Sequence, residues 1–291
     1  MRRISFSSIL VILVLLIAIP VLGQTTDEIY LPVIIRPAIT PTPTSTQAPQ
    51  PTPIPPTDDP KAYVNYYRSL AGVPAVTFNG TLDDNCWQHA RYMAENEDPT
   101  HEQNPALPYA SPAGQICAQN GNAWLGWASV SNYWQPRHSI EGWMSSTGHR
   151  LWLIYPTTPI FGYGFYTASN NYSGAALDVL SNANFTADPG FGGWPLRYPA
   201  PNQTNIPTGD FPITLSWRYF GSVPSITNVS LQTGAGQNVS NTYTTSLAAS
   251  HKGVEVRATG GLQPGTNYSI TIGGTYDGLP FSHSWQFTTV P

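Results

Sequence analysis

The sequence predicts an α+β protein, in which a region of mixed helices and strands is followed by a small all-β sandwich. Between residues 60 and 180, apolar side chains recur at the three- and four-residue spacings of amphipathic helices, and two strand-like runs follow. From Asn182 onward the chain consists of short β-type runs separated by turn residues, which is typical of an antiparallel sandwich. The length of 291 residues fits about two domains with a tail.

Composition limits the partners of this chain. Only 10% of its residues are charged and the net charge is −4 at pH 7. Residues 60–180 carry five basic and eight acidic side chains, and residues 181–291 carry four of each. Phosphate binding needs clustered Lys and Arg, so nucleic acid is excluded as a partner. The abundant Pro, Gly and aromatic residues are typical of loop-rich extracellular proteins.

The N-terminus has the pattern of an export signal. Arg2 and Arg3 supply a positive start, and the apolar run 9–22 is shorter than the ~20 residues of a comfortable membrane span. We therefore predict a signal peptide over residues 1–23 and a secreted or cell-surface protein, with an uncleaved membrane anchor as the alternative. Residues 24–59 form a Pro/Thr-rich linker, which favours an extended spacer and is compatible with association with the cell envelope.

The first two helices are predicted from their caps. Asp59 as N-cap and Pro60 at the first position open a helix that stops at Gly72. A second helix begins at Thr81, where a capping arrangement is available, and continues to about Asn96.

Cys86 and Cys117 are the two cysteines of the chain. In an exported chain an isolated pair favours a disulfide, which here would close a loop of about thirty residues and contribute ~3 kcal/mol. Two buried thiols are the alternative, and metal binding by the pair is disfavoured because nothing near it has ligand spacing. His89 shares the helical face of Cys86, so we expect it to be a core residue.

Residues 140–150 form the most informative motif. Apolar side chains at i, i+3 and i+4 from Ile140 make one face of a short helix. Gly148 falls where a helix C-terminus needs a left-handed residue. We therefore predict that the helix stops at Gly148 and presents His149 and Arg150 directly after the stop.

Residues 99–135 are hard to assign, because Asn, Gly, Pro and Ser dominate them, and a loop of that length is usually functional or contains further elements. Residues 161–168 and 174–180 are predicted strands of a hairpin. The clearest predicted strands of the β region are 211–217, 254–257, 268–272 and 285–289.

Four features occur in order within residues 60–180: the helix stretch 63–68, the stretch Cys-Trp-Gln-His-Ala-Arg-Tyr-Met at 86–93, His101, and the run Gly-His-Arg at 148–150. Together they resemble the CAP superfamily of cysteine-rich secretory, antigen five and pathogenesis-related proteins, also called SCP-like, in its bacterial exported form. The resemblance implies a three-layer α-β-α CAP sandwich. It also implies a cleft in which two histidines and two acidic residues converge, in some members on a divalent metal.

By position, the resemblance assigns the two histidines to His101 and His149. Neutral imidazoles are common zinc ligands, so this pair could hold a divalent metal such as zinc. A catalytic zinc site usually has three protein ligands, and His101 and His149 are the only two candidates evident in the sequence. The alternative is a pair of partly buried histidines that hydrogen-bond loop backbone.

The acidic positions depart from the family. Gln115 or, in another register, Asn120 stands where the family often has a glutamate, and Ser146 stands where some members have a second one. Glu102 and Glu141 are the candidates to compensate. Aromatic residues of the 99–135 segment either line a groove or fill the core. The predicted ligand cleft comprises His101, Glu102, Gln115, Asn120, Trp124, Trp127, Glu141 and His149.

The β region has a resemblance of its own. Residues 261–268 and the terminal run 287–289 are similar to the end of a fibronectin type III or related immunoglobulin-like module. This resemblance implies that Tyr268 is a corner tyrosine whose hydroxyl caps nearby backbone. We therefore predict a CAP domain over residues 60–180 and an immunoglobulin-like β-sandwich accessory domain over residues 181–291.

Neutral residues stand at both positions where the family has acidic residues, and this favours a binding module over an enzyme. We predict an exported CAP protein, at the cell surface or outside the cell, whose cleft takes a hydrophobic, glycan or peptide ligand. The first alternative is a metal-assisted or serine-type hydrolase that uses His101 and His149, with Ser146 as the candidate nucleophile; no catalytic residue is assigned. A structural protein that presents the folded part at the surface is the second alternative.

Overall fold

The computed structural model describes residues 59–291, apart from Ser131. The chain divides into two units, Met1–Thr46 and Gln47–Pro291, and every described residue belongs to the second. The predicted signal peptide 1–23, and the linker 24–59 except its last residue, lie outside the described residues. Among the helices that are described, none combines the length and apolar character of a membrane span.

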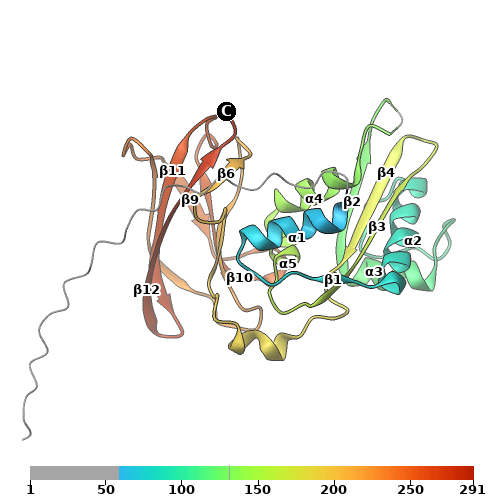
Figure 1. The fold of residues 1–291 in the computed structure, drawn as a ribbon, viewed down its shortest axis with the longest axis horizontal. Coiled ribbons are helices and arrows are strands. Elements are labelled where there is room, and N and C mark those ends of the chain that lie inside the picture. The colour runs from blue at the N-terminus through green and yellow to red at the C-terminus, as the bar shows by residue number, and fades with distance from the viewer. Residues whose placement is uncertain (1–58, 131) are drawn as a thin grey trace, which may run out of the picture. The chain divides into compact units, whose positions relative to one another are not determined.

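Helices occupy the first part of the described chain and strands dominate the second, which confirms the α+β class (Figure 1). The helices are α1 (Pro60–Leu70), α2 (Gly80–Asn96), α3 (Pro112–Gln119), α4 (Pro136–Met144) and α5 (Thr147–Leu153), with 3₁₀ turns η1 (Phe185–Gly190) and η2 (Ala248–Ser250). The strands are β1 (Thr77–Phe78), β2 (Gly121–Trp127), β3 (Ile160–Thr167), β4 (Tyr172–Asp178), β5 (Leu196–Tyr198), β6 (Gln203–Ile206), β7 (Ile213–Trp217), β8 (Ser225–Thr233), β9 (Asn241–Thr244), β10 (Lys252–Ala258), β11 (Asn267–Tyr276) and β12 (Leu279–Thr289).

The first sheet has the strand order β1-β3-β4-β2 and lies between two layers of helices. Figure 1 shows α2 and α3 on one side of this sheet and α1, α4 and α5 on the other. Glycines let α2 approach the sheet closely: a Cβ at Gly164 of β3 would lie 2.0 Å from the backbone nitrogen of Trp87 on α2. The predicted three-layer α-β-α sandwich is therefore present.

The starts of the first two helices follow from their caps. The carboxylate of Asp59 accepts hydrogen bonds from the N–H groups of Lys61 (2.9 Å) and Ala62 (3.2 Å), as predicted. The predicted start of α2 was slightly late. Asn79 is its N-cap and accepts from the N–H of Thr81 (2.9 Å), so the helix already begins at Gly80. The Asn79 side chain satisfies N–H groups that would otherwise be free, and this decides where the helix starts.

The predicted helix stop at Gly148 was wrong. The helix α4 ends at Met144, and after a break at Ser146, whose φ and ψ are −114° and 128°, α5 begins at Thr147. Gly148 lies inside α5, so His149 and Arg150 are helical residues and do not follow a helix end. A side chain here would be crowded, because a Cβ at position 148 would lie 3.1 Å from the Cβ of Ala248.

The segment 99–135 contains two regular elements, the helix α3 and the strand β2. β2 forms the edge of the sheet next to β4, with Gly121 opposite Asp178. The predicted hairpin is present as β3 and β4, in which Thr167 pairs with Ser173. A segment rich in polar residues and glycine therefore supplies one whole strand of the sheet.

The β region, residues 196–289, consists of two four-stranded sheets with the orders β5-β7-β10-β9 and β6-β12-β11-β8. The four predicted strands correspond to β7, β10, β11 and β12; the shorter or more exposed β5, β6, β8 and β9 were not predicted. The Tyr268 hydroxyl accepts a hydrogen bond from the N–H of Gln263 at 2.7 Å, the kind of contact expected of a corner tyrosine. The assignment to an immunoglobulin-like family stays a prediction.

One hydrophobic cluster contains residues of both regions, among them Trp143 and Leu153 of the helices and Ile213 of β7. Arg150 of α5 is fully buried at this junction. Its guanidinium donates to the carbonyl oxygens of Met144 and Pro212, both at 2.9 Å, and burial lowers its pKa to about 10. The helix that carries His149 is therefore fixed directly to the β region.

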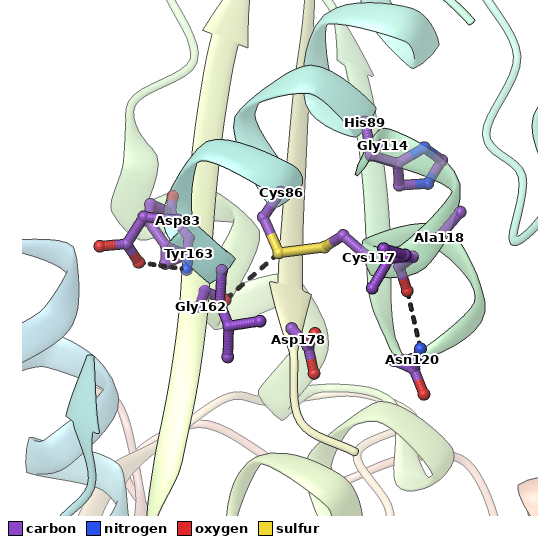
Figure 2. Close-up of a disulfide and its surroundings, with 12 residues drawn as sticks. Asp83, Cys86, His89, Gly114, Cys117, Ala118, Asn120, Gly162, Tyr163 and Asp178 are labelled. Carbon is purple, nitrogen blue, oxygen red and sulfur yellow. Dashed lines mark hydrogen bonds between the residues drawn. A yellow bond between two sulfur atoms is a disulfide. The ribbon is translucent and has the colours of Figure 1, made fainter. Parts of the chain in front are cut away.

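The predicted disulfide is confirmed: Cys86 of α2 and Cys117 of α3 are bonded (Figure 2). Both cysteines are buried, and the bond ties the two helices of one layer together. His89, one turn further along α2, is also buried, as predicted. Its Nε2 lies 2.9 Å from the Thr100 carbonyl oxygen, and the Gln103 amide lies 3.2 Å from its Nδ1.

Candidate functional site

The structure brings His101 and His149 together from distant parts of the sequence. His101 lies in the loop after α2, and His149 lies on α5. Their ring centroids are 6.2 Å apart and the ring planes are inclined by 26°. The Nδ1 of His149 lies 3.1 Å from the Ser146 hydroxyl, and the Nδ1 of His101 lies 3.4 Å from the carbonyl oxygen of Ala118. Each ring therefore has one nitrogen near a protein partner.

The two imidazoles line a cavity of about 540 Å³. Its polar lining consists of His101, Glu102, Gln119, Asn122, Ser146 and His149. Its remaining lining consists of Gly121, Gly148, Trp152, Val179, Leu180, Ala248 and Ala249. A volume of this size, with apolar walls and a few convergent polar groups, is typical of sites for small organic molecules.

Electrostatics favours a neutral His149 in this cavity. Burial lowers the pKa of its imidazole, and the nearby His101 lowers that pKa further. A neutral imidazole has one donor and one acceptor nitrogen, so it can orient a polar group without demanding a countercharge.

Glu102 is the acidic residue that the structure places at this cavity. Gln115 and Asn120 have other partners. The Gln115 side chain accepts from the N–H of Gln103 at 2.6 Å, and the Asn120 side chain donates to the carbonyl oxygen of Ile116 at 2.8 Å. Neither of these two predicted cleft residues lines the cavity of the histidines.

Glu141 lies in a different cavity, of about 420 Å³, together with three tyrosines of α1. Its carboxylate accepts a hydrogen bond from the hydroxyl of Tyr63 at 2.8 Å. The ring of Tyr63 stacks on that of Tyr66, with centroids 5.9 Å apart. Glu141 therefore does not substitute for a missing acid beside His149.

The two predicted cleft tryptophans lie elsewhere. Trp124 on β2 packs against the hydrophobic core, and its ring lies 5.3 Å from that of Trp134. Trp127 ends the same strand and is 56% exposed. Trp152 of α5, a residue for which we predicted no site role, is the tryptophan that lines the cavity of the histidines.

The residues at this cavity do not fit a complete zinc site. A catalytic zinc site takes three protein ligands, and the described part of the chain holds no group of three or more His, Cys, Asp or Glu side chains that could bind a metal. His101 and His149 are the pair predicted for this role, and His149 already pairs its Nδ1 with Ser146.

Besides Trp152, other lining residues of this cavity were not predicted from sequence, and two pairs of them supply apolar surface. Val179 and Leu180 follow β4 and contribute apolar surface, and Ala248 and Ala249 come from the β region. The strand-like sequence pattern that ends at Leu180 can suggest Val179 and Leu180. No local sequence pattern indicates that two alanines, about a hundred residues after His149, lie at the same cavity. The near-contact of Gly148 with Ala248 is the structural sign of their role.

The family model of CAP, the cysteine-rich secretory protein family, matches residues 61–185. These residues form a CAP domain. The match agrees with the fold and with the Gly-His-Arg run on α5, and it covers less than half of the chain. The β region lies outside it. No curated protein matches the sequence.

Solved structures similar to the CAP domain include an outer surface protein from Borrelia burgdorferi. That similarity has a TM-score of 0.29 and 18% identity, and covers 40% of this chain and 85% of the other. The similarity to an extracellular protein containing a SCP domain from Bacillus anthracis has a TM-score of 0.30 and 18% identity, and it covers 41% of this chain and 38% of the other chain. At these TM-scores the assignment to CAP rests on the family model.

Proposed function

We propose that this is an exported binding protein whose CAP domain holds a small amphipathic molecule in the cavity around His101 and His149. The observation that carries the proposal is the composition of this cavity. Trp152, Val179 and Leu180 offer apolar surface, while the two imidazoles offer hydrogen bonds. Of the hydrophobic, glycan and peptide ligands, a compact hydrophobic molecule with one polar group suits this lining best.

The polar groups have separate roles in this proposal. His149, kept neutral by burial that lowers its pKa, gives or accepts one hydrogen bond to the polar group of the ligand. The amide of Asn122 donates to the carbonyl oxygen of His149 at 3.0 Å and so holds α5 against β2. Glu102 lies at the cavity and disfavours anionic ligands beside it.

The cellular location and the domain division belong to the same proposal. The N-terminal pattern and the secretory family of the CAP domain support export by a signal peptide at residues 1–23. The linker 24–59 would then separate the folded part from the cell envelope. We propose the division into a CAP domain over 60–180 and an accessory domain over 181–291 on the basis of their separate sheets.

A fluorescent reporter tests the binding proposal even while the ligand is unidentified. N-phenyl-1-naphthylamine is neutral, mostly apolar and carries one N–H donor. We expect it to bind the full chain at one saturable site, with affinity about tenfold lower in His149→Phe and unchanged in the matched control His283→Ala on β12. Competition by fatty acids, oligosaccharides and peptides then identifies the ligand class. The proposal fails if no saturable site is found for the reporter or for any competitor.

A serine-type hydrolase is the second candidate, and one observation favours it. The Ser146 hydroxyl makes no capping hydrogen bond to α5 and lies 3.1 Å from the Nδ1 of His149, within the distance of a nucleophile and its base. In that reaction His149 would take the hydroxyl proton as the oxygen attacks an ester carbonyl, and would pass it to the alcohol that leaves when the ester C–O bond breaks; water would then hydrolyse the acyl-serine. If Ser146→Ala and the wild type hydrolyse p-nitrophenyl esters at the same rate, this candidate is rejected.

A further inference from the structure

The structure assigns a role to the β region: we propose that its turn η2 is one wall of the ligand cavity and determines which ligands the CAP domain admits. This inference rests on the proposed binding function. The β region would then be part of the binding site, and would not be merely an accessory domain attached to the CAP domain.

The turn reaches the cavity directly. Ala248 and Ala249 line the same cavity as the two histidines. The approach is close, because a Cβ on Gly148, the neighbour of His149, would lie 3.1 Å from the Cβ of Ala248. A glycine at position 148 therefore gives the β region access to the helix that carries the functional histidine.

The backbone of the turn is unusual for its residues. Ala249 has φ 53° and ψ 27°, and Ser250 has φ 59°, so two successive residues with side chains adopt left-handed conformations. Such conformations are unfavourable for residues with a Cβ, and they persist only where the surroundings hold them. Sites of this kind cluster where the backbone must present a particular surface to a ligand.

Packing on both sides holds the turn in place. His251, which follows η2, is 3% exposed, and its ring centroid lies 4.3 Å from that of Trp152, itself a cavity residue. The hydroxyl of Thr147 on α5 donates to the carboxylate of Glu255 on β10 at 2.5 Å. These contacts, together with the buried Arg150, make η2 a fixed wall of the cavity.

The chemistry of the wall indicates how it selects ligands. The β region contributes two methyl groups and no charged side chain to the cavity lining. Such a wall discriminates by size and apolarity, while the hydrogen-bonding groups remain on the CAP side. We therefore infer that η2 limits the length of the apolar part of the ligand, and that removal of side-chain volume there would admit larger molecules.

A thiol placed in the turn tests this inference after folding is complete. Both native cysteines are in the disulfide, so the chain has no free thiol. In Ala249→Cys a single new thiol can be labelled with N-phenylmaleimide in the folded full chain. Ser246→Cys is the matched control, since Ser246 precedes the turn and does not line the cavity.

Two readouts are compared in the labelled and unlabelled forms of each variant. The first is the rate at which diethyl pyrocarbonate modifies His149, followed by peptide mass mapping. The second is the affinity for N-phenyl-1-naphthylamine. We expect the label at position 249 to lower both by about tenfold, and the label at position 246 to change neither. Equal His149 modification rates with and without the label at 249 would overturn the inference.

The two readouts separate this inference from the proposed function. If the label at 249 shields His149 while the unlabelled chain binds no reporter or competitor, the wall is present and the binding function is rejected. If the reporter binds and neither its affinity nor the His149 rate responds to the label, the binding function stands and the wall is rejected. Should labelling at 249 unfold the chain, Ala249→Leu supplies the same obstruction with less volume, and the same two readouts apply.

Discussion

Removal of the disulfide between Cys86 and Cys117 gives a stability change that can be worked out from the structure. The bond spans a sequence separation of 31 residues. In the chain-entropy model, a loop of this length restricts the unfolded chain by about 3.7 kcal/mol at 25 °C. Both cysteines are buried, so the double variant Cys86→Ala/Cys117→Ala also loses buried sulfur contacts. We expect its free energy of unfolding to fall by about 3–4 kcal/mol, with the fold retained.

Urea unfolding of the wild type and the double variant, followed by far-UV circular dichroism, measures this change. A control separates the cross-link from the packing: in the presence of a reductant strong enough to open the bond, the two proteins should have closely similar unfolding midpoints. Thiol titration of the denatured, non-reduced wild type should find no free thiol. A loss of stability below about 1 kcal/mol would show that the cross-link does not stabilise the fold by restricting the unfolded chain, because the loop entropy alone exceeds that value.

Three further changes have calculable directions. Burial lowers the pKa of His251 to about 3 and that of His89 to about 4. Below pH ~6.5 the unfolded chain therefore binds more protons than the folded chain, and the free energy of unfolding falls as the pH falls towards about 4. In urea titrations at a series of pH values, His251→Phe should flatten this dependence. Gly164→Ala should destabilise the fold by about 3 kcal/mol or more, while Gly192→Ala, whose Cβ meets nothing within 4 Å, should leave the melting temperature unchanged. Tyr268→Phe should cost about 1–2 kcal/mol in urea unfolding, since it leaves an N–H group without its acceptor.

Local signals predicted much of the CAP domain. Asp59 and Pro60 define the start of α1 because capping depends on the residue itself and its immediate neighbours. The disulfide was predicted from the count of cysteines and the export signal. The start of α2 was missed by a short distance because Asn79 and Thr81 are both acceptable caps, and only the structure shows that Asn79 accepts the hydrogen bonds from the first N–H groups of the helix.

Errors occurred where tertiary contacts decide the conformation. A glycine can end a helix or make room for a neighbour, and the sequence around Gly148 favours the first interpretation. The second is correct, because Ala248 of the β region approaches α5 at this point. The strand β2 was missed for a similar reason: its pairing with β4 stabilises a run of small and aromatic residues without clear alternation.

The candidate site was predicted only in its histidines, Ser146 and Glu102. His101 and His149 could be identified because the family resemblance relates two positions that are far apart in sequence. Glu141 and Trp124 were assigned to the cleft by proximity in sequence to the motif or by residue type, neither of which determines the direction of a side chain. Ala248 and Ala249 are small, apolar and remote, so only the folded structure brings them to the cavity.

The proposed function requires that a ligand occupy the cavity around His101 and His149. Protection of His149 from diethyl pyrocarbonate by saturating N-phenyl-1-naphthylamine tests it most directly, with His283 of β12 as the internal reference. We expect the bound reporter to slow modification of His149 by about tenfold and to leave His283 unaffected. Equal rates at His149 in the free and the saturated protein would contradict it.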